Sequence, residues 1–158
     1  MDASLFMKSL PLLIYACKNT LIIAFFSTLI GMMGGTLVAL GLRSSFGPLR
    51  WLLSVYTTVV RGTPMVVQIV FFYYGLRLPF SPIVVAIIAI GFNSCAYVSQ
   101  IVLSGINAVE TGQIEAALIM GFSRVQTMRY IVLPQALRVV LPALGNEFIT
   151  LIKDSSLA

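Results

Sequence analysis

The sequence contains no histidine, only two cysteines and few charged residues. Without histidine, the usual general base and a common metal ligand are both missing. Cys17 and Cys95 lie far apart in the sequence, within or beside apolar runs, so they indicate packing rather than a metal cluster or a disulfide. No GxxxxGK[ST] phosphate loop and no dinucleotide-binding glycine pattern occurs. The sequence therefore predicts no catalytic residue, no metal site and no cofactor, and the energy for any transport must come from a partner or a gradient.

Charge is scarce because most of the chain is apolar. Charged residues make up 9% of the 158 residues and hydrophobic residues 59%, with a mean hydropathy of +1.01, whereas soluble domains carry about 25% charged residues. The length suffices for four or five helical spans of about 20 residues each. The net charge of +5 is spread thinly, and bases at the ends of spans are what membrane topology requires. We expect a protein of the lipid bilayer with no nucleic-acid partner.

Four apolar stretches are candidate spans: residues 20–42, 51–76, 83–103 and 135–152. The second stretch is broken at residues 61–64, where Thr63 is expected to cap a helix whose first residue is Pro64. Arg61 would cost roughly 2.5–3.5 kcal/mol at the centre of a membrane, so we expect it near the headgroups or facing protein. In the first stretch, Gly31 and Gly35 form a small-xxx-small pattern that favours close helix packing.

A polar insert, residues 107–134, separates the third stretch from the fourth. From Glu115 onward, apolar residues recur at helical spacing, which predicts a short amphipathic helix. Gly121 interrupts this helix, and Ser123 is a candidate N-cap for a second helix over residues 124–132. Pro134 is expected to end the unit and to open the next apolar run. Two short helices at the membrane surface would offer a soluble partner a surface to bind.

Within the insert, Glu115-Ala116-Ala117 is followed after three residues by Gly121, and after nine more by Ile131-x-Leu133-Pro134. This spacing resembles the coupling loop of the permease subunits of binding-protein-dependent ABC importers. The resemblance implies that Glu115, Ala116, Ala117 and Gly121 dock onto a cytoplasmic ATPase. The alternative is an ordinary amphipathic connector lying on the bilayer.

The break in the second stretch adds to the resemblance. Arg61-Gly62-Thr63-Pro64, followed by Val67-Gln68 and an aromatic run, is similar to the subfamily that imports polar amino acids. The end of the chain, which includes Lys153 and Asp154, resembles the family segment before a final span. That span is absent, so four of the usual five spans are expected and the chain looks truncated. We expect a structural or gating role for the segment 61–64 and for Lys153 and Asp154.

Polar residues within the apolar stretches are candidates for a substrate path. Asn93, Tyr97 and Gln100 follow one another at i, i+4 and i+7 and so share one helix face. Polar groups in lipid need partners or water, so this face is expected to point into the bundle, either toward substrate or for interhelical hydrogen bonding. The family often has an acid where this sequence has Gln100. Gln68 and Glu147 complete the candidate set, and Glu147 either attracts a substrate ammonium or pairs with a base.

The sequence as a whole predicts an all-α polytopic membrane protein, with residues 1–158 as one permease domain like that of a type I ABC importer. The resemblance implies import of polar amino acids across the bacterial cytoplasmic (inner) membrane. Its implied partners are an ABC ATPase dimer, a second permease subunit (the same or a sister chain), and a periplasmic or lipid-anchored amino acid-binding protein. A small excess of bases beside the insert places it in the cytoplasm and the N-terminus outside.

Two alternatives belong to other functional classes. One is a gradient-driven amino acid or ion carrier without an ATPase, in which Arg61, Gln100 and Glu147 form an intramembrane relay. It leaves the pattern in residues 107–134 unexplained. The other is a structural scaffold, which predicts no transport.

Overall fold

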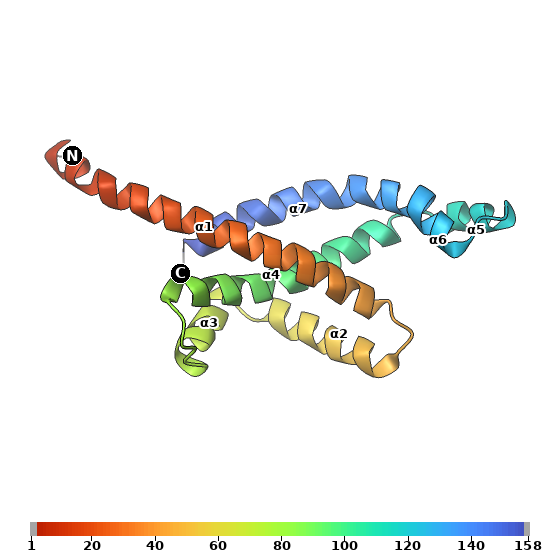
Figure 1. Cartoon of the computed structure of the whole chain (residues 1–158), viewed down its shortest axis with the longest axis horizontal. Helices are drawn as coiled ribbons and strands as arrows, with labels where there is room; N and C mark the ends of the chain where they lie inside the picture. Colours follow the sequence, from red (N-terminus) through yellow and green to blue (C-terminus); the bar gives the residue numbers. More distant parts are fainter. Residues whose placement is uncertain (1–2, 157–158) are drawn as a thin grey trace.

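Long helices build the described chain, which in the computed structural model comprises residues 3–156, with side chains described from residue 9 onward. Every element in this range is helical (Figure 1), which confirms the all-α prediction. In chain order the elements are α1 (Ala3–Leu42), α2 (Gly47–Gly62), α3 (Met65–Val70), the π-helical turn η1 (Phe71–Gly75), α4 (Pro82–Asn107), α5 (Thr111–Ile119), α6 (Arg124–Thr127), the π-helical turn η2 (Met128–Val132) and α7 (Leu133–Ser155).

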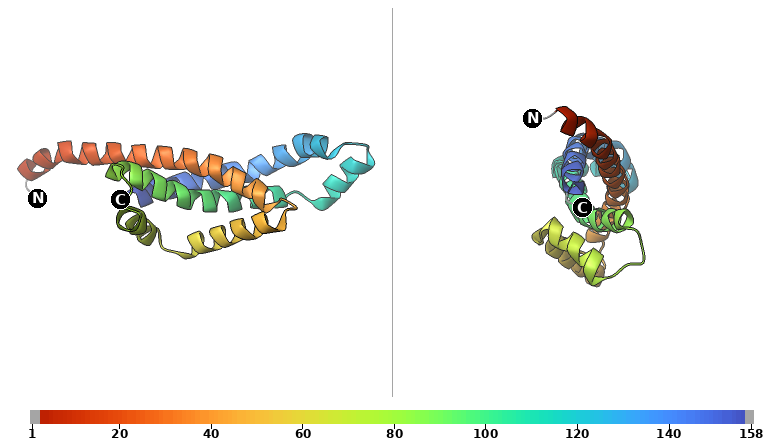
Figure 2. Two further views of the ribbon diagram at one scale, coloured as in Figure 1. Left: turned by 60° about the horizontal axis from the view of Figure 1, so that its bottom comes forward. Right: turned by 90° about the vertical axis from the view of Figure 1, so that its left-hand side faces the viewer.

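Helix α4 lies at the centre of the bundle, in contact with α1, α7, α2 and α3. Figure 2 shows the α2–α3 pair on one side of the layer formed by α1, α4 and α7. The α1–α4 contact is close because glycines of α1 face small side chains of α4. A Cβ atom on Gly31 would overlap Ser94 Oγ, and one on Gly35 would lie 2.7 Å from Val98 Cβ. The small-xxx-small prediction is therefore confirmed, with α4 as its partner.

This close contact makes Gly31→Ala a test of the packing. The added methyl group must displace Ser94, and overpacking of this kind typically costs about 1–3 kcal/mol. We expect a lower unfolding temperature in detergent, measured by the fluorescence of Trp51. Gly145→Ala in α7 is the matched control, because a Cβ there meets nothing within 4 Å, and alanine is the better helix former by about 1 kcal/mol. Equal unfolding temperatures for the two variants would contradict the packing argument.

Two helices of the described chain are long and apolar enough to cross a membrane, Ser9–Leu42 and Pro82–Asn107. The helix pair Gly47–Gly62 and Met65–Gly75 qualifies together but is bent by 108° at the break, as in a broken span or a re-entrant loop. The sequence correctly placed this break. The count of four spans, which includes residues 135–152, stays a prediction.

Two helix boundaries differ from the sequence-based expectation. The first helix does not start near residue 20 but runs from Ala3 through Pro11 to Leu42. Pro134 does not end the unit around the insert, because α6, η2 and α7 follow one another without a loop from Arg124 to Ser155. Pro134 lies in the first turn of α7, directly after a π-helical turn. Proline is tolerated where a backbone N–H already lacks its α-helical partner, so it does not break the helix here.

The loop between α1 and α2 lies at the same end of the bundle as α5 and α6 (Figure 1). Arg43 Nη1 donates a hydrogen bond to Asn107 Oδ1 at 3.3 Å, which joins this loop to the start of the insert. The start of α1, the α3–α4 connection and the end of α7 lie toward the opposite end (Figures 1 and 2). The loop between α1 and α2 and the start of the polar insert are therefore neighbours.

Candidate substrate site and coupling loop

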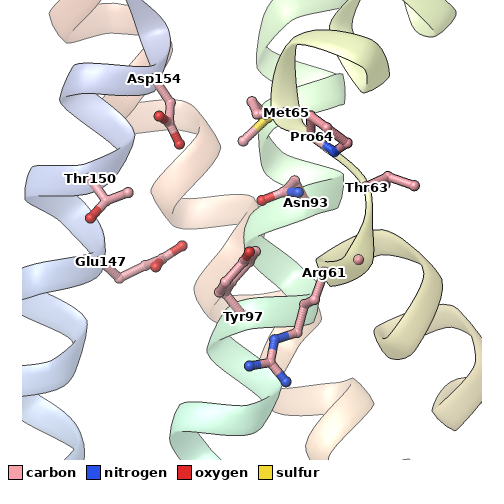
Figure 3. Close-up of a pocket in the computed structure, with 10 residues that line it drawn as sticks. Arg61, Thr63, Pro64, Met65, Asn93, Tyr97, Glu147, Thr150 and Asp154 are labelled. Atoms are coloured by element: carbon pink, nitrogen blue, oxygen red, sulfur yellow. The ribbon is translucent and has the colours of Figure 1, made fainter.

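A polar pocket of about 320 Å³ lies between the break after α2, the middle of α4 and the last part of α7 (Figure 3). It brings together three segments that are far apart in the sequence. Most of its lining residues were singled out from the sequence, namely Arg61, Gly62, Thr63, Pro64, Asn93, Tyr97, Glu147 and Asp154. Met65 and Thr150 were not. Thr150 follows Glu147 by three residues and precedes Asp154 by four, so a shared helix face was a usable signal for it.

The pocket carries opposite charges on facing walls. Arg61 comes from the last turn of α2, whereas Glu147 and Asp154 both project from α7 on the other side (Figure 3). The Arg61 guanidinium lies over the ring of Tyr97, 5.3 Å from its centroid, in a cation–π contact. Glu147 Oε1 accepts a hydrogen bond from Ser94 Oγ at 3.2 Å. The Arg61 guanidinium and the Glu147 carboxylate are therefore held by separate neighbours, across a space that a ligand can occupy.

The sequence suggested that Thr63 caps the helix that follows it, but this prediction is wrong. Its backbone is the C-cap of α2, and Pro64 occupies the N-cap position of α3. Thr63 Oγ1 donates to the Val60 carbonyl at 3.1 Å and accepts from Gln68 Nε2 at 2.6 Å. The last carbonyls of a helix lack intrahelical donors, and this need turns the hydroxyl back toward α2.

The expected polar face of α4 is divided between two cavities. Asn93 and Tyr97 line the charged pocket, whereas Gln100 lines a separate cavity beside Arg50 and Trp51 at the start of α2. A separation of seven residues is about 10 Å along a helix, which carries Gln100 away from the break. Gln68 is buried and accepts a hydrogen bond from Asn93. Lys153 is exposed and does not line the charged pocket. The relay of Arg61, Gln100 and Glu147 is not assembled in one cavity.

The polar insert, residues 107–134, has the two-helix structure that its sequence predicts. Gly121 has a φ of +87° and follows the end of α5. The N–H groups of Phe122 and Gly121 donate to the carbonyls of Ala117 and Leu118, both at 3.1 Å, which is the pattern of a Schellman motif. Ser123 then caps α6 in a reciprocal capping box with Gln126, which confirms the predicted N-cap.

The exposed surface of this loop differs from the expected one at a single position. Glu115, Ala116 and Gly121 are exposed, but Ala117 is fully buried and packs within the chain. Two large apolar side chains at the tip, Ile119 and Met120, are 86% and 68% exposed. The sequence analysis did not select them. Exposed apolar side chains at the tip of a polar loop typically mark a contact surface.

The fold combines a bent and broken helix pair, a charged pocket beside the break and a protruding two-helix loop. Residues 27–158 match the family of the binding-protein-dependent transport system inner membrane component. The chain belongs to this family. It is therefore an integral component of the bacterial inner membrane and a permease subunit of an ABC importer. ATP hydrolysis belongs to a separate ATPase subunit, so this subunit is not an enzyme.

Relatives of known name support the same assignment. The chain is 37% identical over 161 residues to the arginine transport system permease protein ArtQ of Bacillus subtilis, covering 99% of this chain and 74% of the relative. It is 39% identical over 167 residues to the glutamine transport system permease protein GlnP of Escherichia coli, with the same two coverages. These names favour an ATP-driven importer over a gradient-driven carrier.

Solved structures agree with the fold. The chain superimposes with a TM-score of 0.92 and 39% identity on a chain in the crystal structure of an amino acid ABC transporter with histidines, covering 98% of this chain and 74% of that one. A chain of the inward-facing methionine transporter MetNI gives a TM-score of 0.78 at 22% identity, covering 98% of this chain and 74% of that one. The second likeness concerns the fold alone.

Proposed function

We propose that this chain is the permease subunit of an importer for polar amino acids and that the pocket between α2, α4 and α7 binds the substrate. The observation that carries the proposal is the pair of oppositely charged walls. A free amino acid carries a carboxylate and an ammonium group on the same carbon atom. Arg61 suits the carboxylate, since a guanidinium offers paired donors to two oxygens. Glu147 and Asp154 suit the ammonium group.

The loop from α5 to α6 is proposed as the docking surface for the cytoplasmic ATPase, with Glu115, Ala116 and Gly121 exposed on it. The assembly would contain an ATPase dimer, a second permease chain of the same or a sister kind, and a periplasmic or lipid-anchored binding protein that delivers the amino acid. In this arrangement the N-terminus is extracytoplasmic.

The helical connection from the loop to the pocket suggests how the two sites communicate. Because α6, η2 and α7 are continuous, a displacement of α6 by the ATPase would move Glu147 and Asp154 relative to Asn93 and Tyr97 on α4. Such a movement alters the distance between the charged walls and hence the affinity for substrate. Coupling requires that ATP and substrate each bind the two states of the transporter with different affinity.

The test is uptake by proteoliposomes that contain the assembled transporter. Labelled L-glutamine, L-histidine and L-arginine are supplied with the binding protein outside and ATP inside. We expect ATP-dependent uptake of at least one of them. Two analogues of the transported amino acid should compete weakly for uptake. One is the derivative whose α-carboxylate is replaced by a carboxamide, and the other is the 2-hydroxy acid, which lacks the ammonium group. Uptake that follows an imposed ion gradient and ignores ATP would contradict the proposal and favour the gradient-driven carrier.

A further inference from the structure

A buried glutamine joins the break between α2 and α3 to the pocket. Gln68 is 8% exposed. Its Nε2 donates to the Val60 carbonyl at 2.7 Å, to the Thr63 carbonyl at 3.1 Å and to Thr63 Oγ1 at 2.6 Å. Its Oε1 accepts from Asn93 Nδ2 at 3.0 Å. Both ends of the amide are engaged, so Gln68 itself has little capacity left for a ligand.

These contacts fix which way each amide group faces. The carbonyl oxygens of Val60 and Thr63 can only accept, so the NH₂ end of Gln68 must face them. The oxygen of Gln68 is thereby directed at Asn93, whose NH₂ group must donate to it. The oxygen of Asn93 is left on the opposite side. Figure 3 shows this oxygen on the side of Asn93 that faces α7, in the pocket with Glu147.

We propose that Gln68 is a positioning residue that orients the Asn93 amide, so that its oxygen rather than its NH₂ group faces the substrate. This inference rests on the proposed function and extends it to specificity. An acceptor on α4 opposite the Glu147 carboxylate gives the substrate ammonium a second oxygen to bind. Turned the other way, the amide would present N–H groups to a cation that can only donate.

A purely structural role for Gln68 predicts a different outcome. If Gln68 only satisfies the last carbonyls of α2, its loss loosens the pocket and lowers the binding affinity for every ligand by a similar factor. If it orients Asn93, its loss selectively weakens ligands that carry an ammonium group. The ratio of two affinities therefore distinguishes the roles, whereas one affinity does not.

The experiment measures binding of L-glutamine, L-histidine and L-arginine, and of their 2-hydroxy acids, to the detergent-solubilised full chain by calorimetry. The variant Gln68→Met keeps the size of the side chain and removes its hydrogen bonds. We expect the preference of the native chain for the amino acid over its hydroxy acid to fall about tenfold in this variant, the worth of one hydrogen bond to a charged group.

Asn93→Asp in the Gln68→Met background is the rescue variant, because a carboxylate presents an oxygen to the pocket in either orientation. We expect it to restore the preference for the amino acid.

Ser99→Ala is the matched control. Ser99 is fully buried on the same helix and donates to the Ala96 carbonyl at 2.8 Å, so its loss removes a buried hydrogen bond of α4 away from the pocket. In Ser99→Ala, the affinity for the amino acid and the affinity for its 2-hydroxy acid should both stay unchanged.

An unchanged ratio in Gln68→Met, with both affinities reduced, would overturn the inference and leave the proposed function intact. If the native chain binds none of the amino acids, the proposed function fails and the inference falls with it. Should Gln68→Met not insert into the membrane, Gln68→Asn is measured instead. Its amide is one methylene too short to reach both α2 and Asn93, so the same fall in the ratio is expected.

Discussion

Replacing Gly121 by arginine is expected to abolish copurification of the ATPase subunit while the chain still inserts in the membrane. Gly121 has a φ of +87°, where an L-residue costs roughly 1–2 kcal/mol. It also lies exposed between α5 and α6, where a long cationic side chain would prevent close approach of another protein. Both effects act on the proposed docking surface and leave the membrane helices unchanged. The measurement is a pull-down of the tagged chain from mild detergent.

Two further variants separate the causes. Gly121→Ala adds the backbone strain without the bulk, so we expect it to weaken the ATPase interaction only partly. Gly47→Arg is the matched control, since Gly47 begins α2 at the same end of the bundle, is exposed, and has open space where a Cβ would stand. It should retain the ATPase. If Gly121→Arg also retains it, the loop is not the docking surface.

Local signals in the sequence predicted local structure well. The capping box at Ser123 depends on residues three apart, and the end of α5 at Gly121 depends on one backbone conformation that glycine adopts readily. The charged break at residues 61–64 could be placed because a base followed by Gly-Thr-Pro interrupts an apolar run. Such features are determined within a few residues, so no knowledge of the packing is needed.

Features that depend on distant partners could not be predicted in the same way. The hydrogen bond between Gln68 and Asn93 depends on how α3 packs against α4. Helical periodicity placed Gln100 on the same face as Asn93, but the bend between α2 and α3 divides that face between two cavities. The pairing of Glu147 with Ser94 depends on how α4 and α7 pack. Spacing in the sequence carries no information about any of these contacts.

Glu147→Gln is expected to reduce uptake roughly a hundredfold, as is typical when one member of a desolvated, hydrogen-bonded charge pair is lost. The substitution keeps the shape of the side chain, and the amide oxygen can still accept the Ser94 hydrogen bond. Only the negative charge in the pocket is removed, so the loss should appear mainly as a higher KM. ATP-dependent uptake in proteoliposomes measures the effect.

Comparison variants distinguish the charge of Glu147 from its packing. Ser94→Ala removes the hydrogen bond and keeps the carboxylate, so a loss of about tenfold or less is expected for one hydrogen bond. Asn146→Ala alters the exposed neighbour of Glu147, which does not line the pocket, and uptake should be unchanged. If Glu147→Gln transports normally while Asp154→Asn does not, the ammonium group binds to Asp154, nearer the end of α7. If both variants transport normally, the carboxylate wall does not bind the substrate, and the proposed site is wrong.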